Sequence, residues 1–179
     1  PFADAADWVL KTYRIMKKSI RFVMRPARTI SQRGFSLVPE GEYLVPLGVA
    51  DVRRPGSDIT LVAWGPLVHD CLKAADKLKA DRGVSAEVID LRSLVPLDME
   101  TVLRSVQKTG RCVVASQAIH IGSYTGEIAS TIQDVAFDYL DAPVKRVGAK
   151  NGIAPQSHIL EAAFLPNVND IRAAANAIL

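Results

Sequence analysis

The sequence has few of the residues on which disulfide-rich, zinc-binding and membrane-spanning proteins depend. Two cysteines in 179 residues are too few for a disulfide scaffold and lack metal-ligand spacing. The histidines, which stand far apart and form no zinc pattern, are His69, His120 and His158. The longest run without a charged side chain, residues 112–126, contains polar residues and cannot span a bilayer. We therefore expect no metal site, no transmembrane segment and a reducing compartment, either the cytoplasm or, in a eukaryote, the mitochondrial matrix.

Composition favours a folded domain preceded by a basic arm. Apolar residues make up 49% and charged residues 23% of the chain, which excludes wholesale disorder. Residues 1–35 contain eight Lys or Arg against two Asp, whereas residues 36–179 contain fourteen against seventeen acidic residues. The basic pI of 9.0 therefore comes from the arm, and we expect no nucleic-acid partner.

The arm itself has the pattern of a basic amphipathic helix. Apolar residues recur at helical spacing between basic residues over residues 5–24, and Pro26 should end the helix. We favour a helix that packs on the body or on a partner subunit. A membrane-surface or targeting helix is one alternative, and direct nucleic-acid contact is another. Residues 1–37 are accordingly assigned as a basic helical arm and linker, and residues 38–179 as a separate domain.

Strand and helix patterns alternate regularly after Pro55. Short apolar runs bounded by turn residues predict strands, and apolar residues at 3.6-residue spacing predict helices. The expected strands are 58–64, 84–90, 111–115 and 143–147, with residues 43–52 as an antiparallel edge strand. The expected helices are 66–81, 98–109, 124–140, 157–164 and 167–178, with Asp98 and Asn167 as N-caps. This order predicts an α/β three-layer sandwich: a mostly parallel five-stranded sheet with helices on both faces.

Ligands of open α/β sheets bind beyond the carboxyl ends of the strands, where three side chains stand out. His120 is a candidate acid–base residue, but no carboxylate lies near it in sequence, and a surface or interface histidine is the simpler interpretation. Arg92 has the chemistry to hold a carboxylate or phosphate, although an internal ion pair with Asp90, Asp98 or a neighbouring subunit is favoured. We therefore expect a ligand-binding or interface role for the loops that carry Arg92, His120 and Ser123. No catalytic, cofactor-binding or metal residue is assigned.

Ser123 belongs to a Gly-Ser-Tyr-Thr-Gly run just before a predicted helix. Free backbone amides there would suit an anion, but the run lacks both the dinucleotide and the Walker spacing. A tight helix entry is therefore the preferred interpretation. Cys71 and Cys112 fall on apolar faces and are predicted to be core thiols. The end of the helix predicted over residues 124–140 carries three acidic residues, which are predicted to form a solvated face or a partner contact: Asp134, Asp138 and Asp141.

Four segments give the chain a specific resemblance. They are VPLGVADV at 45–52, VSAEVIDLRSLVPLD at 84–98, AFDYLDAPVKRV at 136–147 and FLPNV at 164–168. With these, residues 38–179 resemble the C-terminal half of the β subunit of the E1 component of 2-oxo acid dehydrogenase complexes. That family comprises the thiamine-diphosphate-dependent pyruvate, branched-chain and acetoin enzymes. The resemblance implies a transketolase C-terminal-like domain.

The resemblance also implies a function and partners. The parent assembly uses thiamine diphosphate and Mg²⁺ to decarboxylate a 2-oxo acid oxidatively and transfers the acyl group to the lipoyl group of E2. Its partners would be an E1 α-type subunit, a second β-type chain and, through the C-terminal region, the E2 acyltransferase. The family's activating glutamate and active-site histidine belong to a pyrimidine-binding domain for which no motif is found. We therefore expect this chain to supply interface and assembly surface, to bind no cofactor alone and to be inactive alone.

Departures from the family pattern leave alternatives open. Residues 2–4, 13–14 and 25–26 resemble a remnant of the pyrimidine-binding domain, so about a hundred residues would be missing before Val38 and the chain would be truncated. Loop 116–123 lacks the acidic residue and Gly-Gly pair that the family usually has, so no catalytic role is carried onto His120. The alternatives are a stand-alone interaction or scaffold module and a small-ligand-binding domain that uses Arg92 and His120.

Overall fold

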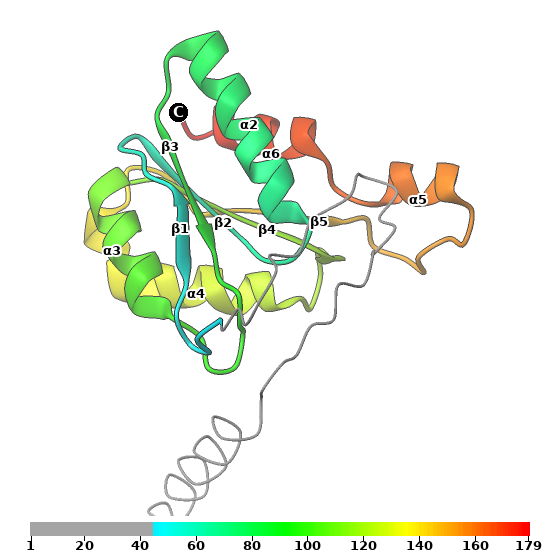
Figure 1. Cartoon of the computed structure of the whole chain (residues 1–179), viewed down its shortest axis with the longest axis horizontal. Helices are drawn as coiled ribbons and strands as arrows, with labels where there is room; N and C mark the ends of the chain where they lie inside the picture. Colours follow the sequence, from blue (N-terminus) through cyan, green and yellow to red (C-terminus); the bar gives the residue numbers. More distant parts are fainter. Residues whose placement is uncertain (1–44) are drawn as a thin grey trace, which may run out of the picture. The chain divides into compact units, whose positions relative to one another are not determined.

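The computed structural model describes residues 45–179, and residues 47–179 form one compact unit. The helix predicted over residues 5–24 and the whole of the arm and linker assigned to residues 1–37 lie outside the described residues. Five strands are present in the described part: β1 (Asp51–Arg54), β2 (Ile59–Ala63), β3 (Ala86–Asp90), β4 (Cys112–Ile119) and β5 (Lys145–Ala149). The helices are α2 (Leu67–Arg82), α3 (Met99–Thr109), α4 (Tyr124–Ala136), α5 (His158–Phe164) and α6 (Val168–Asn176), with a 3₁₀ turn η1 (Phe137–Tyr139). Figure 1 shows their arrangement.

The strands form a single five-stranded sheet in the order β1-β3-β2-β4-β5. All neighbours run parallel except β1, which pairs antiparallel with β3 at the edge. In the central register, Leu61 lies opposite Val88 on one side and Val113 on the other. The predicted α/β sandwich with a mostly parallel sheet is therefore confirmed, including the antiparallel edge.

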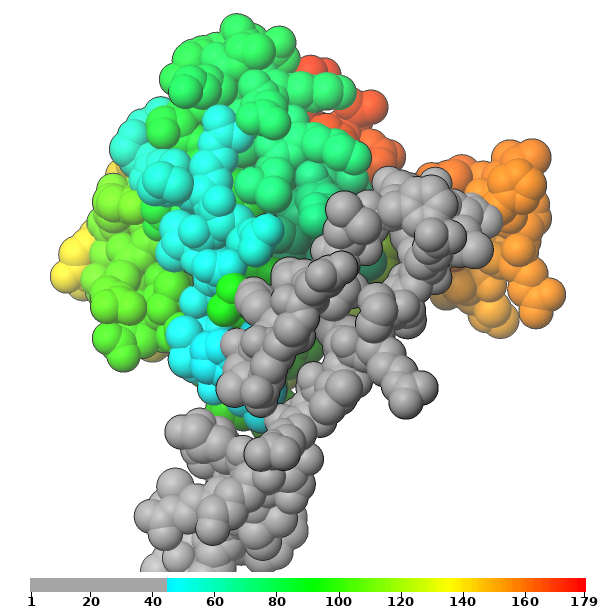
Figure 2. All heavy atoms as spheres, viewed as in Figure 1, coloured from blue at the N-terminus to red at the C-terminus, as the bar shows by residue number. Residues whose placement is uncertain are grey.

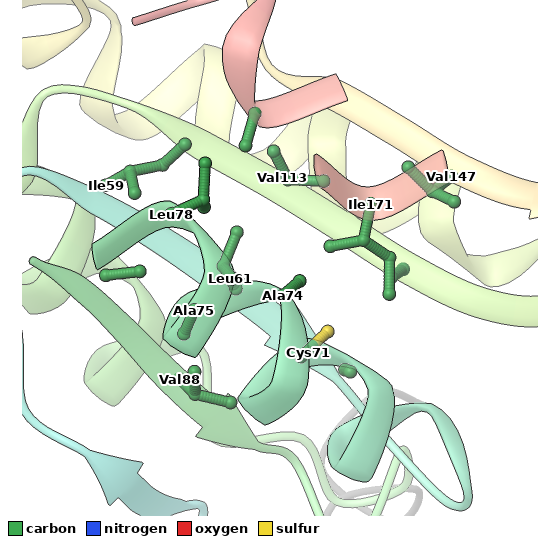
Figure 3. Close-up of a cluster of buried hydrophobic side chains, with 14 of the residues drawn as sticks. Ile59, Leu61, Cys71, Ala74, Ala75, Leu78, Val88, Val113, Val147 and Ile171 are labelled. Carbon is green, nitrogen blue, oxygen red and sulfur yellow. The ribbon is translucent and has the colours of Figure 1, made fainter. Parts of the chain in front are cut away.

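Alternation of side chains along the central strand divides the core into two layers. Ile59, Leu61 and Ala63 of β2 point to the face covered by α2 and α6, whereas Val62 joins the core under α3 and α4. Figure 3 shows the first layer, in which the labelled α2 residues lie over β2, β3 and β4. Both faces of the sheet are thus buried, which explains why strand β2 is a nearly continuous apolar run.

Capping residues set the helix ends at the predicted places. The Asp98 side chain accepts a hydrogen bond from the Thr101 amide at the start of α3, and Gly110 in the left-handed conformation ends that helix. Asn167 begins α6 with a capping box in which Asp170 accepts from the Asn167 amide. The two N-caps read from the sequence, Asp98 and Asn167, are therefore confirmed.

The largest difference from the sequence prediction concerns the third predicted strand. The expected strand of 111–115 and loop of 116–123 are wrong, because β4 continues to Ile119, which pairs with Ala149 after an irregularity in the ladder. Gly148 permits this pairing, since a Cβ there would lie 2.9 Å from the Ala118 carbonyl oxygen. The loop between β4 and α4 is consequently half as long as the predicted loop of residues 116–123.

Other boundaries shift by a few residues. The edge strand begins at Asp51 rather than near residue 43, and β5 begins at Lys145, two residues after its predicted start. Helix α4 ends at Ala136, and the chain continues through η1 instead of one helix to residue 140. No helix in residues 45–179 is long and apolar enough to cross a membrane.

The segment from residue 150 to α5 projects from this body. None of the α5 side chains is buried, and in Figure 2 this segment, coloured orange, stands out beside the rest of the unit. Its apolar residues include Ile153, Ile159 and Leu160, whose exposed fractions are 97%, 69% and 58%. We call residues 150–164 the prong.

Candidate functional site

Arg92 follows β3 directly and is engaged within the domain. Its backbone takes the left-handed conformation with φ 58°, and its amide donates to Asp90 Oδ1 at 3.0 Å. Its guanidinium Nη2 lies 2.6 Å from Oδ2 of Asp51. An internal ion pair was expected, but the side-chain partner is Asp51 rather than Asp90 or Asp98. The antiparallel edge strand causes this, because its register places Asp51 opposite Asp90. The guanidinium is thus already paired rather than free for a ligand.

His120 lies just after β4 and is half-buried. Its amide donates to the Ala149 carbonyl at 3.0 Å, and its own carbonyl accepts from Arg146 at 3.4 Å. Within residues 45–179, no carboxylate forms an ion pair with its imidazole. A general base needs a partner that fixes its tautomer and orientation, so the described residues give His120 no acid–base machinery.

Ser123 begins α4 but does not cap it with its side chain. Its hydroxyl instead shares a hydrogen bond with the Thr125 hydroxyl. The surface here is an open depression lined by Gly122, Ser123, Tyr124 and Glu127. The Glu127 carboxylate gives this depression a negative charge, which opposes an anionic ligand at the helix N-terminus. The tight helix entry, rather than an anion site, is the interpretation that fits this geometry.

The three candidate residues do not form one site. The Arg92 guanidinium pairs with Asp51 on β1, the Ser123 hydroxyl bonds to Thr125, and His120 bonds through its backbone amide. No hydrogen bond joins any two of the three candidates. In the described part of the chain, no group of three His, Cys, Asp or Glu side chains is placed to hold a metal ion. The arrangement offers no nucleophile with an adjacent base and no set of convergent donors for a developing charge.

Both cysteines are inert core residues. Cys71 lies on the buried face of α2 and Cys112 begins β4, and neither is exposed. Burial raises the pKa of each thiol to about 12, with the nearby Asp70 carboxylate as a further cause for Cys71. The prediction that both are core thiols is confirmed.

A second exposed surface, besides the prong, lies at the end of α4. Val135, Phe137 and Tyr139 are 57%, 64% and 53% exposed. Asp134 and Asp138 stand among them, also exposed, with no ion-pair partner in residues 45–179 and no basic residue in the last turn of α4. Carboxylates at the negative end of a helix dipole are unfavourable without a cation. We call this surface, residues 134–139, the α4 tip.

Sequence reasoning missed one set of contacts altogether. Ser93 and Asp98 accept hydrogen bonds from the backbone of Gly48 and Ala50, which precede β1. The two segments are more than forty residues apart, and nothing in the spacing of either indicates the pairing. Tyr124, at the start of α4, also reaches this loop, since its hydroxyl donates to the Leu94 carbonyl at 3.3 Å.

Comparison with known proteins identifies the domain. Residues 48–171 match the model of the transketolase C-terminal domain family. Over 142 residues the chain is 44% identical to the pyruvate dehydrogenase E1 component subunit beta of Bacillus subtilis, covering 79% of this chain and 43% of that protein. It is 39% identical over 155 residues to the 2-oxoisovalerate dehydrogenase subunit beta of Pseudomonas aeruginosa, covering 87% and 43%.

A third relative and a solved structure agree. The acetoin:2,6-dichlorophenolindophenol oxidoreductase subunit beta of Bacillus subtilis is 43% identical over 134 residues, which is 75% of this chain and 39% of that protein. A structure described as a split gene transketolase, inactive beta4 tetramer, superposes with a TM-score of 0.62 at 30% identity, covering 80% of this chain and 44% of that one. The chain thus spans about two fifths of the length of these proteins. It belongs to the transketolase C-terminal domain family.

Proposed function

We propose that this chain serves as the C-terminal assembly part of an E1 β-type subunit in a thiamine-diphosphate-dependent 2-oxo acid dehydrogenase. Such an enzyme decarboxylates a 2-oxo acid oxidatively and passes the acyl group to lipoyl-bearing E2. This domain would supply contact surface for an E1 α-type subunit and a second β-type chain. The family membership and the relatives that are E1 β subunits support the proposal.

One structural observation carries the assembly role. The prong is a helical projection whose side chains are all unburied and mostly apolar, at one end of a domain with a fully packed core. Apolar side chains projecting in this way, such as Ile153 and Ile159, cost free energy in water unless a partner covers them. Its charged residues are few, Lys150 and Glu161, so the surface fits an apolar subunit interface rather than an ionic ligand.

The described residues do not fit the cofactor itself. No cluster of side chains suits Mg²⁺ in residues 45–179, and the depression near Ser123 carries the Glu127 carboxylate, which would repel a diphosphate. Thiamine diphosphate and Mg²⁺ would therefore be bound elsewhere in the parent assembly. This domain would contribute no reacting group to the decarboxylation.

The E2 acyltransferase is the third partner that we propose, and the α4 tip is the surface that suits it. The tip combines exposed Phe137 and Tyr139 with the carboxylates of Asp134 and Asp138, which have no ion-pair partner among residues 45–179. A basic segment of the partner would neutralise these carboxylates and cover both rings, since cations also bind aromatic faces. Helix α6 and the end of the chain lie on the face of the sheet that α2 covers, whereas α4 covers the opposite face (Figure 1).

The experiment is an affinity pull-down from the native cell with this chain as bait, read by mass spectrometry. Recovery of an E1 α-type subunit or of lipoyl-bearing E2 would support the proposal. Two variants separate the surfaces: Ile159→Asp with Leu160→Asp on the prong, and Phe137→Asp on the tip. We expect the first to lose the α-type subunit and the second to lose E2, so each is the other's control. Recovery of neither partner would overturn the proposal.

A second function is favoured by a different observation. The split gene transketolase neighbour is described as an inactive beta4 tetramer, so a chain with this fold can assemble with copies of itself without activity. This chain would then be a stand-alone scaffold module that kept the fold without the chemistry. Self-association as the sole result of the pull-down would favour that function over the first.

A further inference from the structure

Strand β5 is one edge of the sheet, and its outer side pairs with no other strand in residues 45–179. The Ala149 carbonyl accepts from the His120 amide, so the backbone of Ala149 faces β4. Backbone groups point to alternate sides along a strand, so those of Arg146 and Gly148 point away from β4. Within residues 45–179 these outward groups have no backbone partner.

One residue beyond β5, the same outer side already bonds to another part of the chain. Lys150 follows Ala149, and its amide donates to the Phe164 carbonyl at 3.2 Å. Leu165, next to this carbonyl, has extended backbone with φ −75° and ψ 146°. Extended backbone can therefore reach the outer side of β5, and only residues 145–149 are left without such a partner.

Burial along the strand shows that this edge reaches solvent. Val147 and Ala149 are buried, whereas Lys145, Arg146 and Gly148 are half-buried. A glycine has backbone atoms only, so the accessible part of Gly148 is the backbone itself. Accessible, unpaired N–H and C=O groups on an edge strand are a template for a further strand. We call residues 145–149 the β5 edge.

The β5 edge carries one basic side chain on each face of the sheet. Val147 belongs to the core layer under α2 and α6, so alternation puts Lys145 on that face. Arg146 lies on the other face, where its Nη1 is 3.2 Å from the place that a Cβ on Gly126 of α4 would occupy. The same Nη1 donates to the His120 carbonyl at 3.4 Å. Neither base forms an ion pair within the described part of the chain.

The opposite edge of the sheet differs in both respects. The ladder of β1 is irregular between Val52 and Arg54, and such irregularities protect an edge strand against further pairing. Its basic side chains are also neutralised, since Arg53 lies 3.2 Å from Asp51 and Arg54 lies 2.6 Å from Asp76. The unpaired positive charge is therefore a property of the β5 edge in particular.

We propose that the β5 edge binds an extended acidic segment of a partner protein, which joins the sheet as a sixth strand. Main-chain hydrogen bonds to Arg146 and Gly148 would provide the affinity. Two adjacent acidic residues of a strand lie on opposite faces, so they would meet Lys145 and Arg146. A second copy of this edge would place like charges side by side, which disfavours self-pairing. The proposal does not depend on the proposed function.

The test uses the blocked peptide Thr-Val-Glu-Glu-Val-Thr and hydrogen exchange of single amides, measured by NMR on the whole chain. Without peptide, the amides of Arg146 and Gly148 should exchange faster than those of Val147 and Ala149, which face β4. With peptide at about ten times its Kd, exchange of Arg146 and Gly148 should slow about tenfold, and that of Val147 and Ala149 should not change. A contact through side chains alone would not produce this alternation.

Peptide affinity tests the role of charge. The peptide Thr-Val-Lys-Lys-Val-Thr should bind at least about tenfold more weakly than the acidic one. Lys145→Gln with Arg146→Gln keeps the outer backbone and should weaken binding of the acidic peptide about fivefold. The matched control is Arg53→Gln with Arg54→Gln on β1, which removes the same charge from the opposite edge and should leave Kd unchanged. If the first double variant does not fold, the comparison of the two peptides on the unmodified chain decides.

Four results would overturn the proposal. One is protection of Arg146 and Gly148 in the free chain that grows with protein concentration, because a second copy would then occupy the edge. Another is unchanged exchange of both amides on saturation with the acidic peptide. The third is equal affinity for the two peptides, and the fourth is equal weakening by the two double variants. None of these results bears on whether an α-type subunit binds, so the two proposals fail separately.

Discussion

Oε2 of Glu87, on β3, lies 2.5 Å from Nζ of Lys108, on α3, although the Glu87 side chain is only 6% exposed. Oε2 also accepts from the Gly56 amide at 3.1 Å. Burial raises the pKa of Glu87, but the hydrogen bonds from Lys108, Ser105 and Gly56 outweigh it, and the pKa lies below its ordinary value. A charged carboxylate is therefore stable inside the amino end of the sheet because its partners are in place.

Replacing Glu87 by Gln should lower the free energy of unfolding by about 1–3 kcal/mol, since Lys108 and Gly56 lose a charged acceptor. The matched control is Glu100→Gln on α3, whose carboxylate lies 3.7 Å from Arg104 with both side chains exposed. That change should cost less than about 0.5 kcal/mol. Urea denaturation monitored by circular dichroism measures both. Equal losses for the two variants would contradict the role given to burial.

The stability of the domain should fall as the solution is acidified. Hydrogen bonds lower the pKa of Asp58, chiefly that from the Ser85 amide. The pKa of Asp98 is also lowered. Burial raises this pKa, but the hydrogen bonds from the amides of Ala50 and Thr101 outweigh the effect of burial. A carboxylate whose folded pKa lies below its unfolded pKa stabilises the fold above the unfolded pKa, and this stability is lost as pH falls through the folded value. Stability should thus be flat above about pH 6 and decline below about pH 5.

The slope of this decline identifies the groups responsible. Glu87→Gln should reduce the slope, because one carboxylate whose pKa is lowered in the folded state is gone. Thermal unfolding followed between acidic and neutral pH provides the measurement. A stability that rose on acidification would contradict the lowered pKa values of Asp58, Glu87 and Asp98.

The native chain should be unreactive towards thiol reagents. Cys71 and Cys112 are buried, and their raised pKa values of about 12 leave almost no thiolate at neutral pH. Titration with a chromogenic disulfide should report no accessible thiol in buffer and two in urea. Rapid reaction of either cysteine under native conditions would show that the core around α2 or β4 opens far more readily than its packing indicates.

Local chemistry made most of the fold predictable. Apolar runs bounded by turn residues identified β2 and β3. The N-caps predicted from the sequence, Asp98 and Asn167, are the N-caps in the structure. The errors arose where a distant segment decides the outcome. Ile119 is in a strand because Gly148 lets β5 approach, and β1 starts at Asp51 because β3 supplies its ladder. Neither pairing leaves a mark in the local sequence.

The candidate residues show the same limit. Arg92 was expected to form an internal ion pair, and it does, but its partner Asp51 lies forty-one positions away, at the end of the segment predicted as the edge strand, and was not among the expected partners. Ser123 and His120 were chosen because they follow a parallel strand, yet a strand end does not itself create a cavity. Ser93, which holds Gly48, was not singled out, because a loop serine carries no local signal of its acceptor role.

Thiamine diphosphate should not bind measurably to this chain alone. The described residues include no metal-ligand cluster, and the depression at the start of α4 contains the Glu127 carboxylate. Isothermal calorimetry with the cofactor and Mg²⁺ should give no heat beyond dilution. Micromolar binding that disappears when the metal is chelated would overturn this expectation and would require a site formed with other residues of the chain.

The isolated chain should self-associate through the prong. A domain whose α5 leaves Ile159 and Leu160 at 69% and 58% exposure has apolar surface to cover, and a second copy is the partner always present in a purified sample. Light scattering should give a mass above that of the monomer. Ile159→Asp with Leu160→Asp should shift this mass towards the monomer, because each carboxylate would lose its hydration in the contact. Glu161→Gln, on the same helix, alters charge without adding a buried polar group and should keep the assembly. A monomer at high concentration, or an assembly unaffected by the double variant, would show that the prong is not the contact.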